Sequence, residues 1–130
     1  MGIRTRLEQQ FDYDIVDEFL DHFDIMTEVM EPTIIALEKE PLRDEKINEL
    51  FRLFHNIKSA SSFLRLERIQ LVAELAEEMM ERLRSNSSNV DAEIIDWLLV
   101  VSDQLRDWYL QISNDGELED TSPKILKIPE

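Results

Sequence analysis

The chain has 130 residues, a length that suits one domain around a single hydrophobic core. Its 29 acidic residues outnumber its 14 Lys and Arg residues, and the formal net charge of −15 argues against a nucleic-acid or membrane-surface partner. Cysteine is absent, which excludes disulfides, thiolate metal sites and cysteine nucleophiles. We expect a folded, acidic domain, and the cytoplasm is its default location.

The N-terminal third of the chain predicts one short and one long helix. A short helix over residues 5–11 is expected to pack across one end of the fold. Apolar residues then recur at helical spacing over residues 13–37, but Pro32 interrupts the pattern. A kink over residues 28–32, or two short helices meeting there, is therefore expected. The buried stripe of this segment is Ile15, Phe19, Phe23, Met26, Met30, Ile34 and Leu37.

Three further amphipathic helices are predicted at about residues 43–64, 67–84 and 91–112. The third of the long helices should expose its glutamates, and the fourth should bury its two tryptophans in the core. A polar loop over residues 85–89 offers N-cap oxygens to the last helix, and Asn114-Asp115-Gly116 supplies its stop. The glutamates are Glu74, Glu77, Glu78 and Glu81, and the tryptophans are Trp97 and Trp108.

Four amphipathic helices joined by short loops predict an all-α fold, an antiparallel four-helix bundle. We assign residues 1–11 to an N-terminal extension or short helix and residues 12–114 to the bundle. Residues 115–130 are polar and contain proline, so they are expected to form a mobile tail or a linker, apart from Ile125 and Leu126.

The chemistry of the chain rests on its two histidines. The only glycines, Gly2 and Gly116, leave no phosphate-binding loop between them, so no ATP site is expected. His22 lies in an acidic helix face and is interpreted as a solvated side chain. Neither histidine has a glutamate three residues before it, which disfavours the di-iron sites of helical bundles, and no metal or cofactor is expected.

His55 stands out by its position on the helical wheel. At about 100° per residue it falls opposite the apolar centre of its helix, with Lys58 and Ser59 one turn away and Arg52 and Ser62 on the same side. Residues 52–68 hold four basic residues and one acidic residue in an otherwise acidic chain. A neutral imidazole is a good nucleophile near pH 7, and Lys58 could neutralise an attached phosphoryl group. An ordinary surface histidine in a salt-bridged face is the alternative.

A stretch around this histidine resembles a known signature. Residues 51–64 read FRLFHNIKSASSFL. This stretch is similar to the signature of histidine-containing phosphotransfer (HPt) domains, His-x-x-Lys-Gly followed by small residues on the second helix of a four-helix bundle. The resemblance implies a phosphorelay intermediate, in which His55 is the phosphoacceptor and Lys58 stabilises the phosphohistidine. Arg52, Ser59 and Ser62 would flank the phosphoryl group.

The chain departs from this signature at two positions. Ser59 replaces the glycine that usually follows the lysine, and Arg65 replaces a glycine often found ten residues after the histidine. Ser59 could narrow a partner's approach or donate a hydrogen bond to the phosphate. Arg65, at the end of a helix, costs backbone freedom and adds positive charge. Phe63 is an apolar residue on the polar side of its helix, and it either joins Arg65 in docking a partner or packs locally at the helix end.

The resemblance also implies partners. A response-regulator receiver domain, a histidine kinase, or both would exchange the phosphoryl group with His55, and Mg²⁺ would belong to the receiver. The chain would then be a phosphocarrier rather than a self-sufficient enzyme. A non-phosphorylated adaptor that binds receivers or kinases is the alternative, and Ser59 and Arg65 are the residues that favour it. The sequence leaves the oligomeric state open.

Overall fold

The structure is a computed structural model that describes residues 1–130, apart from the side chain of Ser88. The described backbone is helical and has no strands. It contains α1 (Ile3–Gln10), α2 (Tyr13–Ile35), α3 (Arg43–Phe63), α4 (Glu67–Ser85), α5 (Ala92–Ser113) and α6 (Pro123–Leu126), with 3₁₀ turns η1 (Ala36–Glu38), η2 (Glu40–Leu42) and η3 (Ser87–Asn89).

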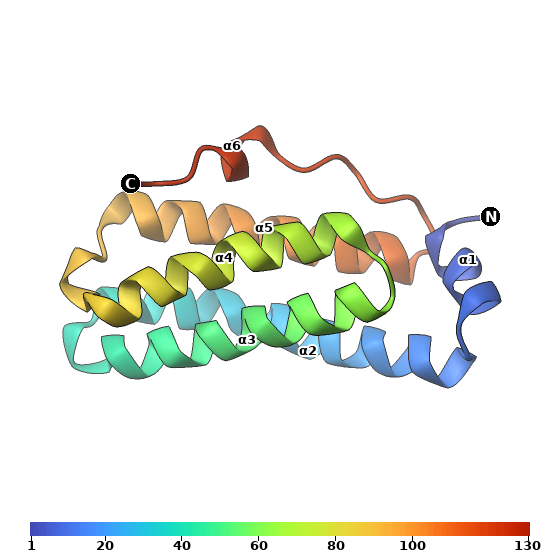
Figure 1. Cartoon of the computed structure of the whole chain (residues 1–130), viewed down its shortest axis with the longest axis horizontal. Coiled ribbons are helices and arrows are strands. Elements are labelled where there is room, and N and C mark those ends of the chain that lie inside the picture. The colour runs from blue at the N-terminus through green and yellow to red at the C-terminus, as the bar shows by residue number, and fades with distance from the viewer.

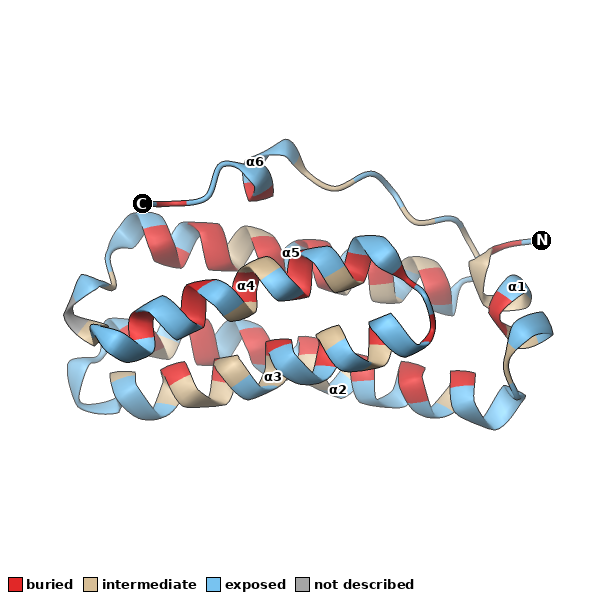
Figure 2. Ribbon diagram, in the orientation of Figure 1, coloured by how far each residue is buried: buried red, intermediate tan, exposed pale blue. Residues whose placement is uncertain are grey.

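The four long helices α2 to α5 form an antiparallel bundle, which confirms the predicted fold class (Figure 1). The helix α3 packs most extensively against α4, and α2 packs against α5. Figure 2 shows the buried positions of each helix turned toward the bundle interior. The predicted core tryptophans, Trp97 and Trp108, are both buried. No helix in the described chain has the length and apolar character needed to cross a membrane.

The long helix α2 differs from its prediction in two ways. It runs without a break through Pro32, so the alternative of two short helices is wrong. Pro32 stands only three residues before the helix ends at Ile35, where its missing N–H removes one intrahelical hydrogen bond near the terminus. Ile15 was expected in the core but is exposed, and its neighbour Val16 is fully buried in its place.

Both caps of α5 are made by aspartates. At the N-terminus the carboxylate of Asp91, not the preceding polar loop, accepts a hydrogen bond from the Ile94 backbone N–H at 2.9 Å. At the C-terminus the left-handed residue is Asp115, with φ of 55°, and not Gly116. The N–H of Gly116 donates to the Gln111 carbonyl at 2.8 Å, which closes the helix end.

The C-terminal tail (residues 115–130) was predicted to be a mobile tail or a linker apart from Ile125 and Leu126, but it packs along α5 (Figure 1). The indole N–H of Trp97 donates to the Ile125 carbonyl at 2.9 Å, and that of Trp108 donates to the Glu119 carbonyl at 3.0 Å. The buried amide of Gln104 contacts the tail through both its oxygen and its nitrogen. These bonds satisfy polar groups that would otherwise be buried without partners, so the tail belongs to the fold.

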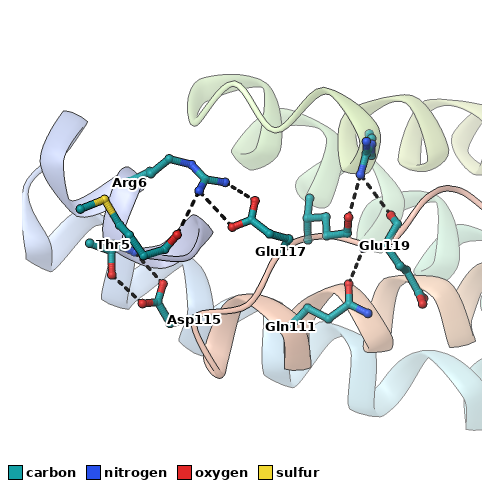
Figure 3. A network of polar contacts seen from close by, with 9 residues as sticks. Thr5, Arg6, Gln111, Asp115, Glu117 and Glu119 are labelled. Carbon is teal, nitrogen blue, oxygen red and sulfur yellow. Dashed lines mark hydrogen bonds and ion pairs between the residues drawn. The ribbon is translucent and has the colours of Figure 1, made fainter.

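A polar network joins the tail to α1 (Figure 3). The carboxylate of Asp115 accepts hydrogen bonds from the Thr5 backbone N–H and hydroxyl, and Arg6 pairs with Glu117. Thr5 lowers the pKa of Asp115 by these hydrogen bonds. A Cβ on Gly2 would lie 1.7 Å from the Asp115 carbonyl oxygen, so only glycine fits there. The first helix and the first residues of the tail therefore lie together at one end of the bundle (Figure 1).

Candidate functional site

His55 lies in the middle of α3 and faces solvent. Its side chain is 52 % exposed, as the helical wheel predicts, while its neighbours Phe54 and Ile57 are fully buried. The packing of these neighbours fixes the face that α3 turns to the core. His55 is therefore presented on the outer surface of a well-packed helix.

A glutamate of the adjacent helix holds the imidazole. The Nδ1 atom of His55 lies 2.9 Å from Oε2 of Glu77 on α4, and Nζ of Lys58 donates to the other carboxylate oxygen of Glu77 at 2.8 Å. The Glu77 side chain is only 16 % exposed. One carboxylate thus joins the histidine and the lysine that stand one turn apart on α3.

The charge of Glu77 determines which histidine nitrogen is available. Burial alone would raise the pKa of Glu77, but hydrogen bonds from Lys58 and then His55 outweigh it and lower the pKa overall. Glu77 is therefore ionised at neutral pH and can only accept hydrogen bonds, so Nδ1 of the neutral imidazole carries the proton. The Nε2 atom keeps its lone pair and makes no hydrogen bond within the described chain.

Lys58 is already engaged in the unmodified protein. Its hydrogen bond to Glu77 raises the pKa of Lys58. The ammonium group is partly exposed and lies on the same side of α3 as the imidazole, since both contact one carboxylate. A dianion on His55 would compete with Glu77 for this charge.

A second contact acts on the face of the imidazole. The rings of Phe51 and His55 are stacked, with centroids 6.2 Å apart and an interplanar angle of 9°. The guanidinium carbon of Arg84, on α4, lies 4.5 Å from the centroid of the Phe51 ring. Phe51 itself is half-buried beside His55.

Three predicted neighbours of His55 lie around the site without touching the ring. Arg52, Ser59 and Ser62 are exposed on α3, and no hydrogen bond joins them to His55 in the described structure. Ser59 and Ser62 line a shallow polar depression beside Lys58. Their predicted contact with a phosphoryl group stays a prediction.

Comparison with known proteins identifies this arrangement. The Hpt domain family matches residues 14–115, which span the four bundle helices from the second residue of α2 onward. The chain belongs to the Hpt domain family. Its place there confirms the resemblance around His55 and assigns the chain to histidine phosphorelay in two-component signalling. No solved structure matches the chain.

Two chemotaxis proteins and a sensor histidine kinase are similar to this Hpt domain over most of its length. The chemotaxis protein CheA of Borreliella burgdorferi is 23 % identical over 105 residues, 81 % of this chain and 12 % of the relative. The sensor histidine kinase CheAY of Helicobacter pylori is 27 % identical over 103 residues, 79 % of this chain and 13 % of the relative. The chemotaxis protein CheA of Treponema pallidum is 22 % identical over 93 residues, which are 72 % of this chain and 12 % of the relative. The chain spans about an eighth of the length of these curated relatives.

The departure from the Hpt signature at Arg65 has a visible backbone consequence. Arg65 follows the end of α3 with φ of 61°, a left-handed conformation that glycine adopts without strain. The N–H of Leu66 donates to the Ser61 carbonyl at 2.8 Å across this turn. Arg65 thus keeps the helix-ending turn at a conformational cost and leaves its cation exposed.

Phe63 lies at the edge of an apolar groove between α2 and α3. Its side chain is 62 % exposed, yet its ring also packs against Phe11 at 5.7 Å between centroids. The contact supports local packing at the helix end, and the docking role stays a prediction. Two adjoining hollows share Phe19, His22 and Ala60 and extend the groove along the helices. The sequence analysis interpreted His22 as solvated, and it is exposed, but it also lines this groove.

The sequence analysis missed Glu77 as a site residue. It placed Glu77 on the outer face of α4 together with Glu74, Glu78 and Glu81, and Glu77 is instead half-buried against α3. A signal was present, because Glu77 stands four residues after Ala73 and three before Met80, and both are buried. This spacing puts Glu77 at the edge of the buried stripe, one turn from each.

Proposed function

We propose that His55 is the phosphoacceptor of this Hpt domain and that Nε2 is the reacting atom. The observation that carries the proposal is the hydrogen bond between Nδ1 and the ionised Glu77, which leaves the lone pair on the exposed side of the ring. Glu77 also stabilises the positive charge that develops on the imidazole during attack. It therefore serves as a positioning and electrostatic partner of His55.

The proposed transfer exchanges one phosphorus bond for another. The Nε2 lone pair attacks the phosphorus of a receiver's aspartyl phosphate or of a kinase-bound ATP, and the bond from phosphorus to the leaving oxygen breaks. The reverse reaction returns the phosphoryl group to a receiver aspartate. Positioning and charge neutralisation supply most of the catalysis in such loose transition states. Lys58 supplies one positive charge beside His55, and Mg²⁺ is expected on the receiver.

The proposed partners are a receiver domain, a histidine kinase, or both, in the cytoplasm. The groove between α2 and α3 offers an apolar surface beside the site, with Phe63 at its edge. Arg65 adds an exposed cation near the same helix end. An apolar groove next to an exposed nucleophile suits a docking surface that brings a partner's active site over Nε2.

The test uses phosphoramidate, a small donor that needs no partner protein. We expect the wild-type chain to gain a phosphoryl group that is acid-labile and alkali-stable, with loss of ammonia from the donor. The variant His55→Gln should gain none, while His22→Gln, which removes the other histidine, should react like the wild type. Mass spectrometry of the intact proteins measures the phosphoryl group gained by the wild type and by each variant.

A second step separates a phosphocarrier from an adaptor. The phosphorylated chain is mixed with a panel of purified receiver domains and Mg²⁺, and the loss of its phosphoryl group is followed over time. Transfer to at least one receiver supports the phosphocarrier. A chain that takes no label from phosphoramidate or from phosphorylated receivers, but binds receivers, would be the adaptor.

A further inference from the structure

The ring of Phe51 stacks on the imidazole of His55 and has no role in the transfer step proposed above. Glu77 fixes which nitrogen is free, but a single hydrogen bond at Nδ1 leaves the imidazole able to tilt about its bond to Cβ. The Phe51 ring lies nearly parallel to the imidazole, at 9°. Offset stacking of aromatic rings is favourable and restricts the angle between their planes. The two contacts therefore constrain different motions of one ring.

Arg84 restrains Phe51 in turn. It stands seven residues after Glu77 on α4, about 10 Å along the helix axis at the rise of an α-helix. Because α3 and α4 are antiparallel, Arg84 lies toward the start of α3, and Phe51 lies between it and His55. The guanidinium contacts the Phe51 ring at 4.5 Å, a distance typical of a cation–π interaction. In the part of the chain that the structure describes, Arg84 also makes a weak ion pair with Glu81, at 3.5 Å.

We propose that Phe51 and Arg84 are positioning residues that set the plane of the His55 imidazole for in-line attack on a docked partner. The lone pair of Nε2 lies in the ring plane, so the tilt of the ring decides the direction of attack. A partner protein brings its phosphorus to a fixed place, whereas a small donor aligns itself with whatever direction the lone pair takes. The inference rests on the proposed function of His55 and adds a requirement that applies only to transfer between proteins.

The test compares the two kinds of donor. The receiver domain that removes the label fastest from the wild-type chain is used as the protein partner, and phosphoramidate as the small one. Phe51→Leu keeps an apolar side chain but has no flat ring. We expect the maximal rate of transfer to the receiver to fall roughly three- to tenfold with its KM unchanged, while the rate with phosphoramidate stays within about twofold. Phe51→Tyr restores a flat ring and should restore the rate.

Arg84→Gln tests the same stack from a side chain that is 43 % exposed. We expect Arg84→Gln to reduce the maximal rate of transfer to the receiver by less than Phe51→Leu does. Lys46→Gln, which removes an equal charge from α3 where it pairs with Glu49, is the matched control and should leave the rate unchanged. Proton NMR gives an independent readout, because the ring current of Phe51 shifts the imidazole protons of His55 and this shift should disappear in Phe51→Leu.

Each outcome has a defined meaning. An unchanged rate of transfer to the receiver in both Phe51→Leu and Arg84→Gln would overturn the inference, and so would an equal loss with phosphoramidate, since that would show a chemical or structural effect. If Phe51→Leu does not fold, Arg84→Gln and the Phe51→Tyr rescue decide it. A wild-type chain that takes no label from phosphoramidate and gives none to any receiver would instead remove the proposed function itself.

Discussion

The site around His55 and the packing of the C-terminal tail join distant parts of the chain in opposite ways. At the site, Glu77 on α4 reaches half-exposed side chains of α3, and one nitrogen of the histidine is left without a partner in the described chain. At the tail, buried indole and amide groups of α5 bind tail groups, mostly of the main chain, and Ile125 is fully buried. Chemistry needs an unsatisfied, accessible atom, whereas stability needs buried groups that are satisfied.

The largest effect that tests this contrast is expected from replacing His55. Replacement by Gln should abolish phosphoryl acceptance completely while changing the free energy of unfolding by no more than about 0.5 kcal/mol, because the side chain is exposed. Labelling with phosphoramidate measures phosphoryl acceptance, and thermal unfolding of the same samples measures the change in stability. A large loss of stability would mean that the site also supports the fold and that the contrast is false.

The tail should show the reverse behaviour. Ile125→Ala is expected to lower the free energy of unfolding by about 2–4 kcal/mol, because it removes a fully buried side chain and leaves a cavity. The folded protein should still accept a phosphoryl group at the wild-type rate. Its neighbour Leu126 is 60 % exposed, so Leu126→Ala is the control and should have little effect. Urea unfolding of both variants measures the difference; equal values would mean that the tail is not packed in solution.

Glu77 belongs to the site and also contributes to stability, and its contribution to stability is expected to depend on pH. Its pKa is lower in the folded protein than its ordinary value of 4.5, so its stabilising effect is present above that value and is lost as the pH falls through the folded pKa. We expect Glu77→Gln to be less stable than the wild type by about 1 kcal/mol at neutral pH. The difference should shrink below pH 4.5. Unfolding curves at several pH values test this, and a difference that does not change with pH would exclude the charge of Glu77 as its cause.

The smallest expected effect concerns the turn after the site helix. Arg65→Gly should raise the free energy of unfolding by about 0.5–1 kcal/mol, because glycine tolerates the left-handed conformation that arginine adopts there at a cost. Ser62→Gly, in the right-handed helix three residues earlier, is the matched control and should lower stability by a similar amount. A loss of stability in both variants would show that the Arg65 side chain contributes more than the strain costs.

The parts of the fold that follow from local pattern were accessible from the sequence. The predicted helix at residues 43–64 corresponds to Arg43–Phe63, and the one at 67–84 to Glu67–Ser85, because apolar spacing over many residues defines such helices strongly. The exposure of His55 followed from the same spacing. The continuity of α2 through Pro32 did not follow from the sequence, because a proline in the last turn of a helix is tolerated when the rest of the helix is packed.

The sequence by itself determined an acidic helical bundle with an outward-facing histidine in a basic segment of its second long helix, because periodicity, charge and motif are properties of neighbouring residues. Only the tertiary structure decided that Glu77 holds Nδ1 and that the tail fills the side of α5. The Glu77 and tail contacts join residues 22 and 28 positions apart, and they depend on how the helices are rotated and aligned against one another. The helical pattern of one segment does not contain that information.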